Sequence, residues 1–128
     1  SIGDSLAIFS KNRKNLSSEF YIFPKIAGEY KLEPIKSFNV NSLITGGDYN
    51  EKLKLLALSA YDFDSDEQFI HVLKNFDLNK INYLNFTKFT LPIRDVQIEA
   101  IKIIDNQTFW LTSESERFGY PKLIKIIL

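Results

Sequence analysis

Five polar residues of this chain are the side chains best suited to holding a ligand, namely Thr45, Asp48, Gln97, Glu99 and Glu114. Three of them are carboxylates, and oxygen ligands are what hard cations such as calcium prefer. Each lies in or beside a predicted strand, so they converge only if neighbouring strands line a common channel. Two interpretations stay open. Either the three carboxylates hold a metal ion, with calcium as the cofactor, or they accept hydrogen bonds from backbone N–H groups of adjacent strands.

A second acidic feature is the loop Asp62–Glu67, where acids alternate as they do at the start of an EF-hand. The sixth position of that pattern needs glycine but holds Glu67, and the twelfth needs an acid but holds Leu73. The sequence therefore favours a solvated hairpin loop over a calcium loop.

His71 is the only histidine and lies in a predicted strand. Catalysis would require a nucleophile and an orienting acid beside it, and the sequence indicates neither. A hydrogen-bonded or partly exposed strand histidine is expected.

Gly46 and Gly47 lack the strand-to-helix context of a phosphate-binding loop, so close packing of a strand is expected there. Of the adjacent Phe109 and Trp110, one ring must face inward.

Composition indicates one folded domain of ordinary size. The chain has 128 residues, of which 45% are hydrophobic, with eleven Phe and six Tyr to fill a core. Sixteen basic residues balance sixteen acidic ones and form no stripe, which argues against a nucleic-acid partner. The chain has no cysteine, so disulfides and zinc-thiolate sites are excluded. No apolar run is long enough to span a membrane.

The apolar pattern predicts an almost entirely β protein, because short alternating runs rich in β-branched and aromatic residues dominate it. One outer strand, covering residues 30–40, is expected to be interrupted at Pro34, which cannot donate to a ladder. Residues 77–83 are expected to form a short helical turn. The other predicted strands cover residues 5–10, 18–23, 43–49, 54–61, 68–76, 85–91, 98–103, 108–112 and 122–128.

The predicted strands recur at a nearly fixed spacing. Leu6–Ile8 matches Leu56–Leu58 at 50 residues, and Ala57 matches Leu111 at 54. A period near 50 made of short strands is typical of a β-propeller. The predicted fold is therefore all-β, a partial β-propeller of four-stranded antiparallel blades, with a β-sandwich or barrel of about ten strands as the alternative. Residues 1–128 form one domain or propeller segment, and its blade parts cover residues 5–40, 43–92 and 96–128.

This parsing leaves the first blade without its first strand and the last without its fourth. Closed propellers need more blades, so the remaining blades of a larger chain, or a protein partner, are expected to complete the structure. An open stack would expose apolar side chains. The residues expected to be exposed in that case are Phe20, Phe23, Tyr61 and Phe69.

Three segments, Leu43–Tyr49, Gln97–Ile101 and Leu111–Glu114, carry a family resemblance. The chain resembles the later blades of secreted or surface bacterial β-propeller proteins, whose inner strands read Ile-Thr-Gly-Ala-Asp-Tyr and Gln-x-Glu-Gly-Ile. It is also similar to propellers of the esterase-like phytase and gluconolactonase types. It departs from the pattern at Ala100, where glycine is usual, and at Gly47, where alanine is usual.

The resemblance implies an extracytoplasmic protein, whether periplasmic, at the cell surface or secreted, and it implies no particular substrate. The expected function is that of a non-catalytic propeller segment serving binding or assembly. The alternative is part of a cation-dependent, hydrolase-like propeller acting on a phosphorylated or lactone substrate, with the three carboxylates contributing to its site.

Overall fold

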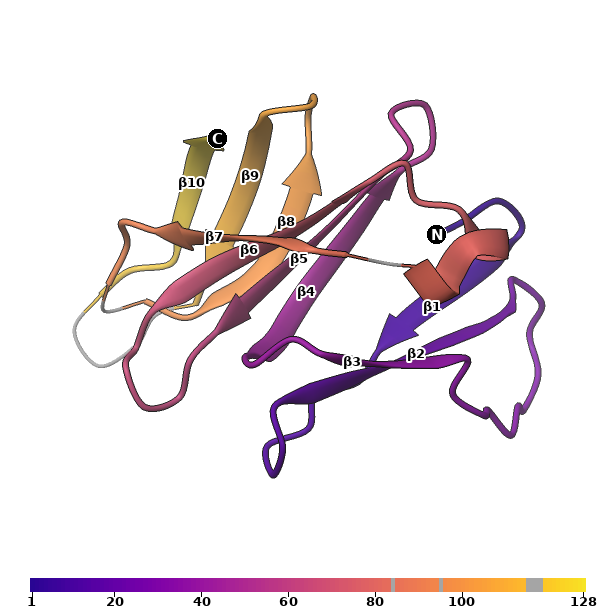
Figure 1. Cartoon of the computed structure of the whole chain (residues 1–128). Coiled ribbons are helices and arrows are strands. Elements are labelled where there is room, and N and C mark those ends of the chain that lie inside the picture. Colours follow the sequence, from indigo (N-terminus) through magenta and orange to yellow (C-terminus); the bar gives the residue numbers. More distant parts are fainter. Residues whose placement is uncertain (84, 95, 115–118) are drawn as a thin grey trace.

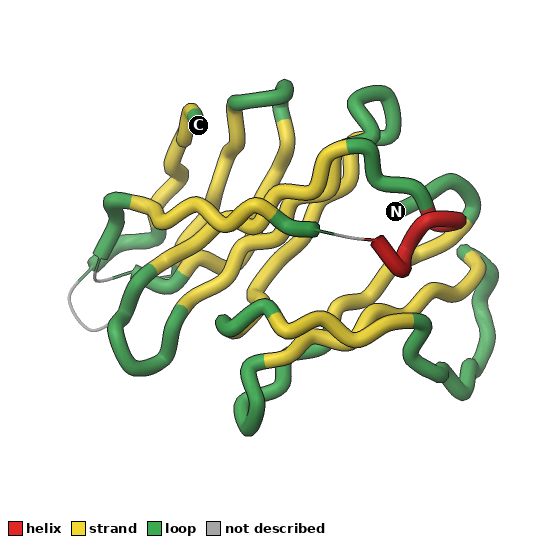
Figure 2. The backbone as a smooth tube through the Cα atoms, in the orientation of Figure 1, coloured by secondary structure: helices red, strands yellow, loops and turns green. Residues whose placement is uncertain are grey.

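The computed structural model describes residues 1–83, 85–94, 96–114 and 119–128. These ranges contain ten β-strands and one short 3₁₀ helix, η1, and they contain no α-helix (Figures 1 and 2). The elements are β1 (Ser5–Phe9), β2 (Ser17–Pro24), β3 (Lys36–Asn39), β4 (Leu43–Asn50), β5 (Leu55–Tyr61), β6 (Gln68–Lys74), η1 (Leu78–Tyr83), β7 (Thr87–Leu91), β8 (Ile98–Ile103), β9 (Thr108–Ser113) and β10 (Lys122–Ile127).

The strands form three antiparallel sheets, and each sheet is made of strands consecutive in the sequence. The first sheet has the order β1-β2-β3, the second β4-β5-β6-β7 and the third β10-β9-β8 (Figure 1). The all-β prediction is confirmed. The strands make three separate sheets. A sandwich would have two packed sheets, and a barrel would have one closed sheet.

Most strand bounds follow the sequence pattern, and the short helical turn predicted near residues 77–83 is η1. Of the outer strand predicted over residues 30–40 with an interruption at Pro34, only Lys36–Asn39 is a strand, so the part predicted before Pro34 is wrong. Ile35 N donates to Phe20 O at 2.8 Å, and the ladder begins only there. Since the preceding residue, Pro34, has no N–H, it cannot extend the ladder toward the N-terminus.

The sheets stack face to face and enclose two cores. The first core lies between the first and second sheets and includes Phe20, Leu58 and Phe69. The second lies between the second and third sheets and includes Ile70 and Phe109. Alternation along each strand sends side chains to opposite faces, so the second sheet, which supplies both cores, is buried on both sides.

The prediction that an open stack would expose Phe20 and Phe69 is wrong. Both are buried, at 0% and 3% exposure, because the first sheet covers that side of the second. Phe23 and Tyr61, from the same prediction, are half-buried. No helix in the described part of the chain is long and apolar enough to cross a membrane.

Candidate functional site

The predicted ligand-binding residues lie on or beside two strands, β4 and β8, that run side by side in the same direction (Figure 1). Near one end, Gly46 lies against the backbone of Glu99 and Ala100. Two residues further along each strand, Asp48 contacts Lys102 and Ile103. The two strands belong to different sheets, so this line of contact joins the second sheet to the third.

Gly46 permits the close approach of the two strands. A Cβ placed on it would lie 2.9 Å from the carbonyl oxygen of Glu99, 2.9 Å from Ser59 Oγ and 3.1 Å from Ala100 Cα. The first of these distances is to backbone, which cannot move aside as a side chain can. The expectation that Gly46 serves close packing of a strand is therefore confirmed.

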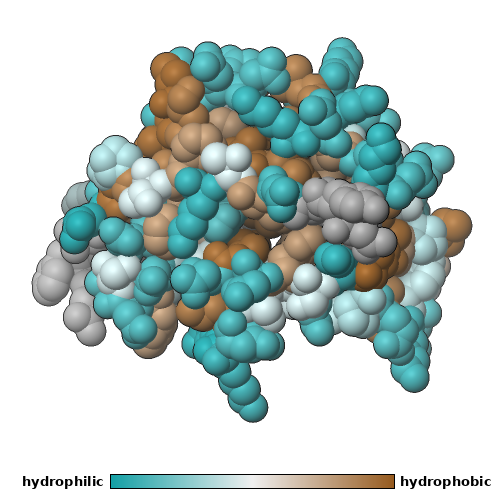
Figure 3. Space-filling view, viewed as in Figure 1, coloured by the Kyte–Doolittle hydropathy of each residue, from teal (hydrophilic) through white to brown (hydrophobic). Residues whose placement is uncertain are grey.

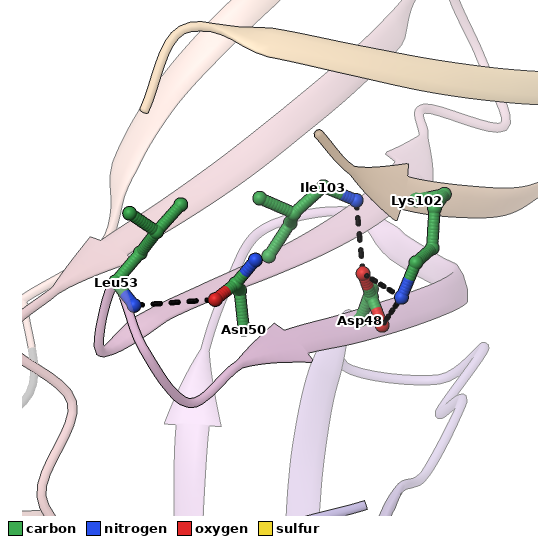
Figure 4. Close-up of polar contacts among 5 residues, drawn as sticks. All are labelled: Asp48, Asn50, Leu53, Lys102 and Ile103. Carbon is green, nitrogen blue, oxygen red and sulfur yellow. Dashed lines mark hydrogen bonds and ion pairs between the residues drawn. The ribbon is translucent and has the colours of Figure 1, made fainter. Parts of the chain in front are cut away.

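Asp48 links β4 to β8 through a hydrogen bond and an ion pair (Figure 4). Its Oδ2 accepts a hydrogen bond from the buried N–H of Ile103 at 2.9 Å and lies 3.0 Å from Lys102 Nζ, which is also 3.1 Å from Oδ1. The lysine side chain is 66% exposed and the aspartate 17%, so the ion pair is screened while the backbone contact is protected. For this residue the interpretation as a backbone acceptor fits the contacts.

Thr45 and Glu99 occupy β-bulges. The register of β4 shifts between Ile44 and Gly46, and that of β8 between Ile98 and Ala100, which leaves Thr45 and Glu99 as the extra residues. A bulge turns its side chain away from the regular alternation. Thr45 Oγ1 then contacts Ser59 Oγ at 3.0 Å.

Gln97 and Glu99 are brought together, because the amide Nε2 of Gln97 donates to Oε1 of Glu99. The backbone N–H of Glu114 donates to Gln97 O at 3.3 Å, while the side chain of Glu114 is exposed. Within the described ranges, no three acidic or histidine side chains come close enough to share a metal ion. A calcium site formed by Asp48, Glu99 and Glu114 therefore stays a prediction without structural support.

The acidic loop after β5 closes on itself. Asp62 Oδ1 accepts the backbone N–H groups of Asp64 at 2.8 Å and Ser65 at 3.2 Å, and Asp62 N donates to Glu67 O. These are the local bonds by which an aspartate caps a turn. The expectation of a solvated hairpin loop fits this geometry.

The sequence predicted a hydrogen-bonded or a partly exposed histidine at position 71. His71 is hydrogen-bonded, and at 2% exposure it is buried. Its Nε2 lies 2.8 Å from Oγ of Ser42, which is 1% exposed. Burial, and secondarily the charge of Lys88, lowers the pKa of His71 from 6.5 to about 4. Sequence reasoning missed Ser42, because the serine lies 29 positions away and only the packing of β6 brings it near.

The Ser42–His71 pair does not have the arrangement of a nucleophile and its base. Ser42 Oγ also lies 3.1 Å from the carbonyl oxygen of Val40, which can only accept. Because the serine has a single hydroxyl proton, both bonds are made only when that proton goes to Val40 and the imidazole donates its own N–H to the serine. A general base would have to accept the serine proton instead. Together with the burial of both side chains, this makes the pair a structural bond.

Gln68 is a second buried polar residue that the sequence did not single out. Its Oε1 accepts the N–H of Ile98 at 3.3 Å, which links β6 to the start of β8. Ser113 Oγ, by contrast, is the one buried side-chain polar atom in the described part of the chain that has no hydrogen-bond partner. Both residues adjoin Ile98, which follows Gln97 in the sequence: Gln68 accepts its N–H, and Ser113 is its partner in register.

A small cavity of about 160 Å³ lies on the other side of β4, between the first and second sheets. Its lining is a mixture of small, apolar and polar groups. They are Ser1, Ile2, Ala7, Phe9, Ile44, Thr45, Gly46, Gly47, Asp48, Tyr49 and Leu56. This volume would hold a few water molecules and is well below that of an ordinary small-molecule site.

Comparison with protein-family models, with curated proteins and with solved structures gives no match to this chain.

Proposed function

We propose that the chain is a segment of a β-propeller and that it serves binding or assembly without catalysis of its own. The observation that carries the proposal is the contact of β4 with β8, which lie side by side in different sheets. Gly46 meets Ala100 and Asp48 meets Lys102, and each pair is 54 positions apart. The constant spacing means that the first strands of two consecutive sheets lie side by side and run in the same direction, as successive inner strands of a propeller would.

The strand registers support the same arrangement for the first sheet. Ala7 pairs with Ile22, and Ala57 pairs with Val72, each residue of the second pair lying 50 positions after its counterpart. The first sheet would then hold the second, third and fourth strands of a blade, and the third sheet the first, second and third strands. This matches the two incomplete blades expected from the sequence.

One predicted spacing needs correction by a single residue. Leu58 pairs with Gly47, and Leu111 pairs with Ile101, so the counterpart of Leu111 is Leu58 at a spacing of 53. Ala57 was the wrong partner, because Ala57 and Leu111 line one core from opposite sides. Side chains that face each other across a core cannot occupy equivalent places in their own sheets.

The chemistry of the polar groups favours binding over catalysis. The Ser42–His71 pair is buried with its proton directed away from the imidazole, and the carboxylate of Asp48 is engaged by Lys102 and a backbone N–H. Among the residues that the structure describes, no contact favours the hydrolase-like alternative. The extracytoplasmic location is part of the proposal and rests on the sequence resemblance alone.

Hydrogen exchange tests the stacked architecture. In a stack, each sheet depends only on its neighbours, so the second sheet, which has two, should exchange slowest. We expect the amides of β5 and β6 to exchange slowest, with the first and third sheets opening separately at lower free energy. A single protection level across all three sheets would contradict the repeat architecture.

Calorimetry with calcium tests the non-catalytic part. We expect no stoichiometric binding at millimolar calcium, since the structure does not gather the three carboxylates. A tight site that disappears in Glu99→Gln, and persists in the matched loop variant Glu67→Gln, would overturn this part and restore the cation-dependent alternative.

A further inference from the structure

The outer face of the first sheet is apolar and partly exposed, with the ring of Tyr30 packed on Phe23. Leu6 and Ile8 of β1 are 38% and 43% exposed, whereas Ala7 between them packs against the first core. In the adjoining strand, Phe23 lies opposite Leu6 and Tyr21 opposite Ile8. Cross-strand partners share a face of a sheet, so these four side chains form one surface, called here the N-terminal face.

The outer face of the third sheet is also apolar. Phe109 is fully buried in the second core, and its neighbour Trp110 points the other way with 36% exposure. Leu123 and Ile127 of β10 are 67% and 68% exposed. With Trp110 and Lys125 they form the C-terminal face. Figure 3 shows exposed apolar surface at the upper left of the molecule, in the region where Figure 1 places β10.

The two faces carry opposite charges. On the N-terminal face, Glu19 accepts a hydrogen bond from the hydroxyl of Tyr21 at 2.6 Å. That bond is the main reason why the pKa of Tyr21 is raised, and the charge of Glu33 adds to it, so two carboxylates lie near this face. On the C-terminal face, Lys102 and Lys125 both lie opposite Trp110 in register. The ammonium group of Lys102 is already paired with Asp48 of the same chain, so Lys125 is the lysine that this face offers a partner.

We propose that the N-terminal face of one copy of this chain docks on the C-terminal face of a second copy. The contact would join apolar centres and bring Glu19 and Glu33 toward Lys125. It would repeat the way the second and third sheets already meet, with an apolar core and an ion pair between Asp48 and a lysine. The inference rests on the proposed function, because it treats the end sheets as units whose outer faces become covered.

Such a contact is heterologous, because each copy uses two different surfaces, and it extends head to tail until a ring closes. Its strength is limited by its size. A face three strands wide and about six residues long measures roughly 14 by 20 Å, which is small for a stable interface. We therefore expect a dissociation constant in the micromolar range.

Sedimentation velocity from about 1 µM to about 1 mM tests the proposal. The weight-average mass of the wild-type chain should rise with concentration. Ile8→Glu blocks the N-terminal face and Leu123→Glu the C-terminal face, so each variant alone should remain a monomer. Mixed together they should form a one-to-one complex, because each retains one intact face. Phe63→Glu, at a loop residue with 67% exposure away from both faces, should associate like the wild type.

A charge exchange provides a second test that does not place an acid in an apolar face. Glu19→Lys and Lys125→Glu should each weaken association about tenfold, and the double variant should recover most of that loss. The inference is overturned if the folded wild type stays monomeric throughout, if either single-face variant still self-associates, or if the mixture shows no complex. Hydrogen exchange on the monomeric variants tests the stack of sheets independently, so the two proposals can fail separately.

Discussion

The buried histidine makes the stability of this protein depend on pH in a calculable way. At 2% exposure, with a pKa of about 4, His71 stays neutral in the folded chain while the unfolded chain protonates near pH 6.5. Above pH 6.5 both states carry the neutral ring, and its contribution to stability is complete. As the pH falls toward 4, only the unfolded state takes up the proton, so the free energy of unfolding decreases.

The size of this effect follows from the two pKa values. A tenfold change in an equilibrium is worth about 1.4 kcal/mol, so the loss is about 2 kcal/mol by pH 5 and about 3 kcal/mol at pH 4. The assay is urea unfolding between pH 7.5 and 4, compared with His71→Gln, which cannot titrate. The difference between the two curves isolates the histidine from the carboxylates that titrate in the same range.

Because His71 is the only histidine, its ring protons can also be followed directly by NMR. We expect a titration midpoint well below 5 in the folded protein. A midpoint near 6.5, or a pH dependence of stability that His71→Gln does not change, would refute the reasoning from burial.

Three pairs of substitutions test the packing. Gly46→Ala should cost about 1 to 3 kcal/mol, because its Cβ meets backbone, while Gly28→Ala, with its nearest contact at 3.5 Å, should change stability by less than about 0.5 kcal/mol. Asp48→Ala should lower the free energy of unfolding by about 1 to 3 kcal/mol, because it leaves a buried N–H unpaired, and Asp48→Asn should lower it by less. Phe109→Ala should cost about 3 to 5 kcal/mol, and the exposed Phe63→Ala about 0.5 kcal/mol or less. Urea unfolding at low protein concentration measures all of these stability changes. If the variant expected to be milder loses more stability than the other member of its pair, the contact assigned to that pair is contradicted.

The sequence alone predicted most of the strands, because strand formation here depends on local properties. Alternating apolar residues, β-branched side chains and turn residues specify where the chain extends and where it reverses. The error in the strand predicted over residues 30–40 also has a local cause, because no strand forms on the N-terminal side of Pro34. Within each sheet, strands pair with their sequence neighbours. This pairing is local where the connection is short, as between β4 and β5 or β8 and β9, whereas residues 25–35 and 75–86 form longer links before β3 and β7.

Which sheet covers which face was decided only by tertiary structure. Phe20 and Phe69 read as exposed side chains until the first sheet was seen to cover the second. The partners of the polar residues were equally hidden, since Asp48 meets Lys102 across 54 positions and His71 meets Ser42 across 29. Such contacts depend on how separate sheets stack, and burial then determines whether a carboxylate or an imidazole is a ligand, a base or a structural bond.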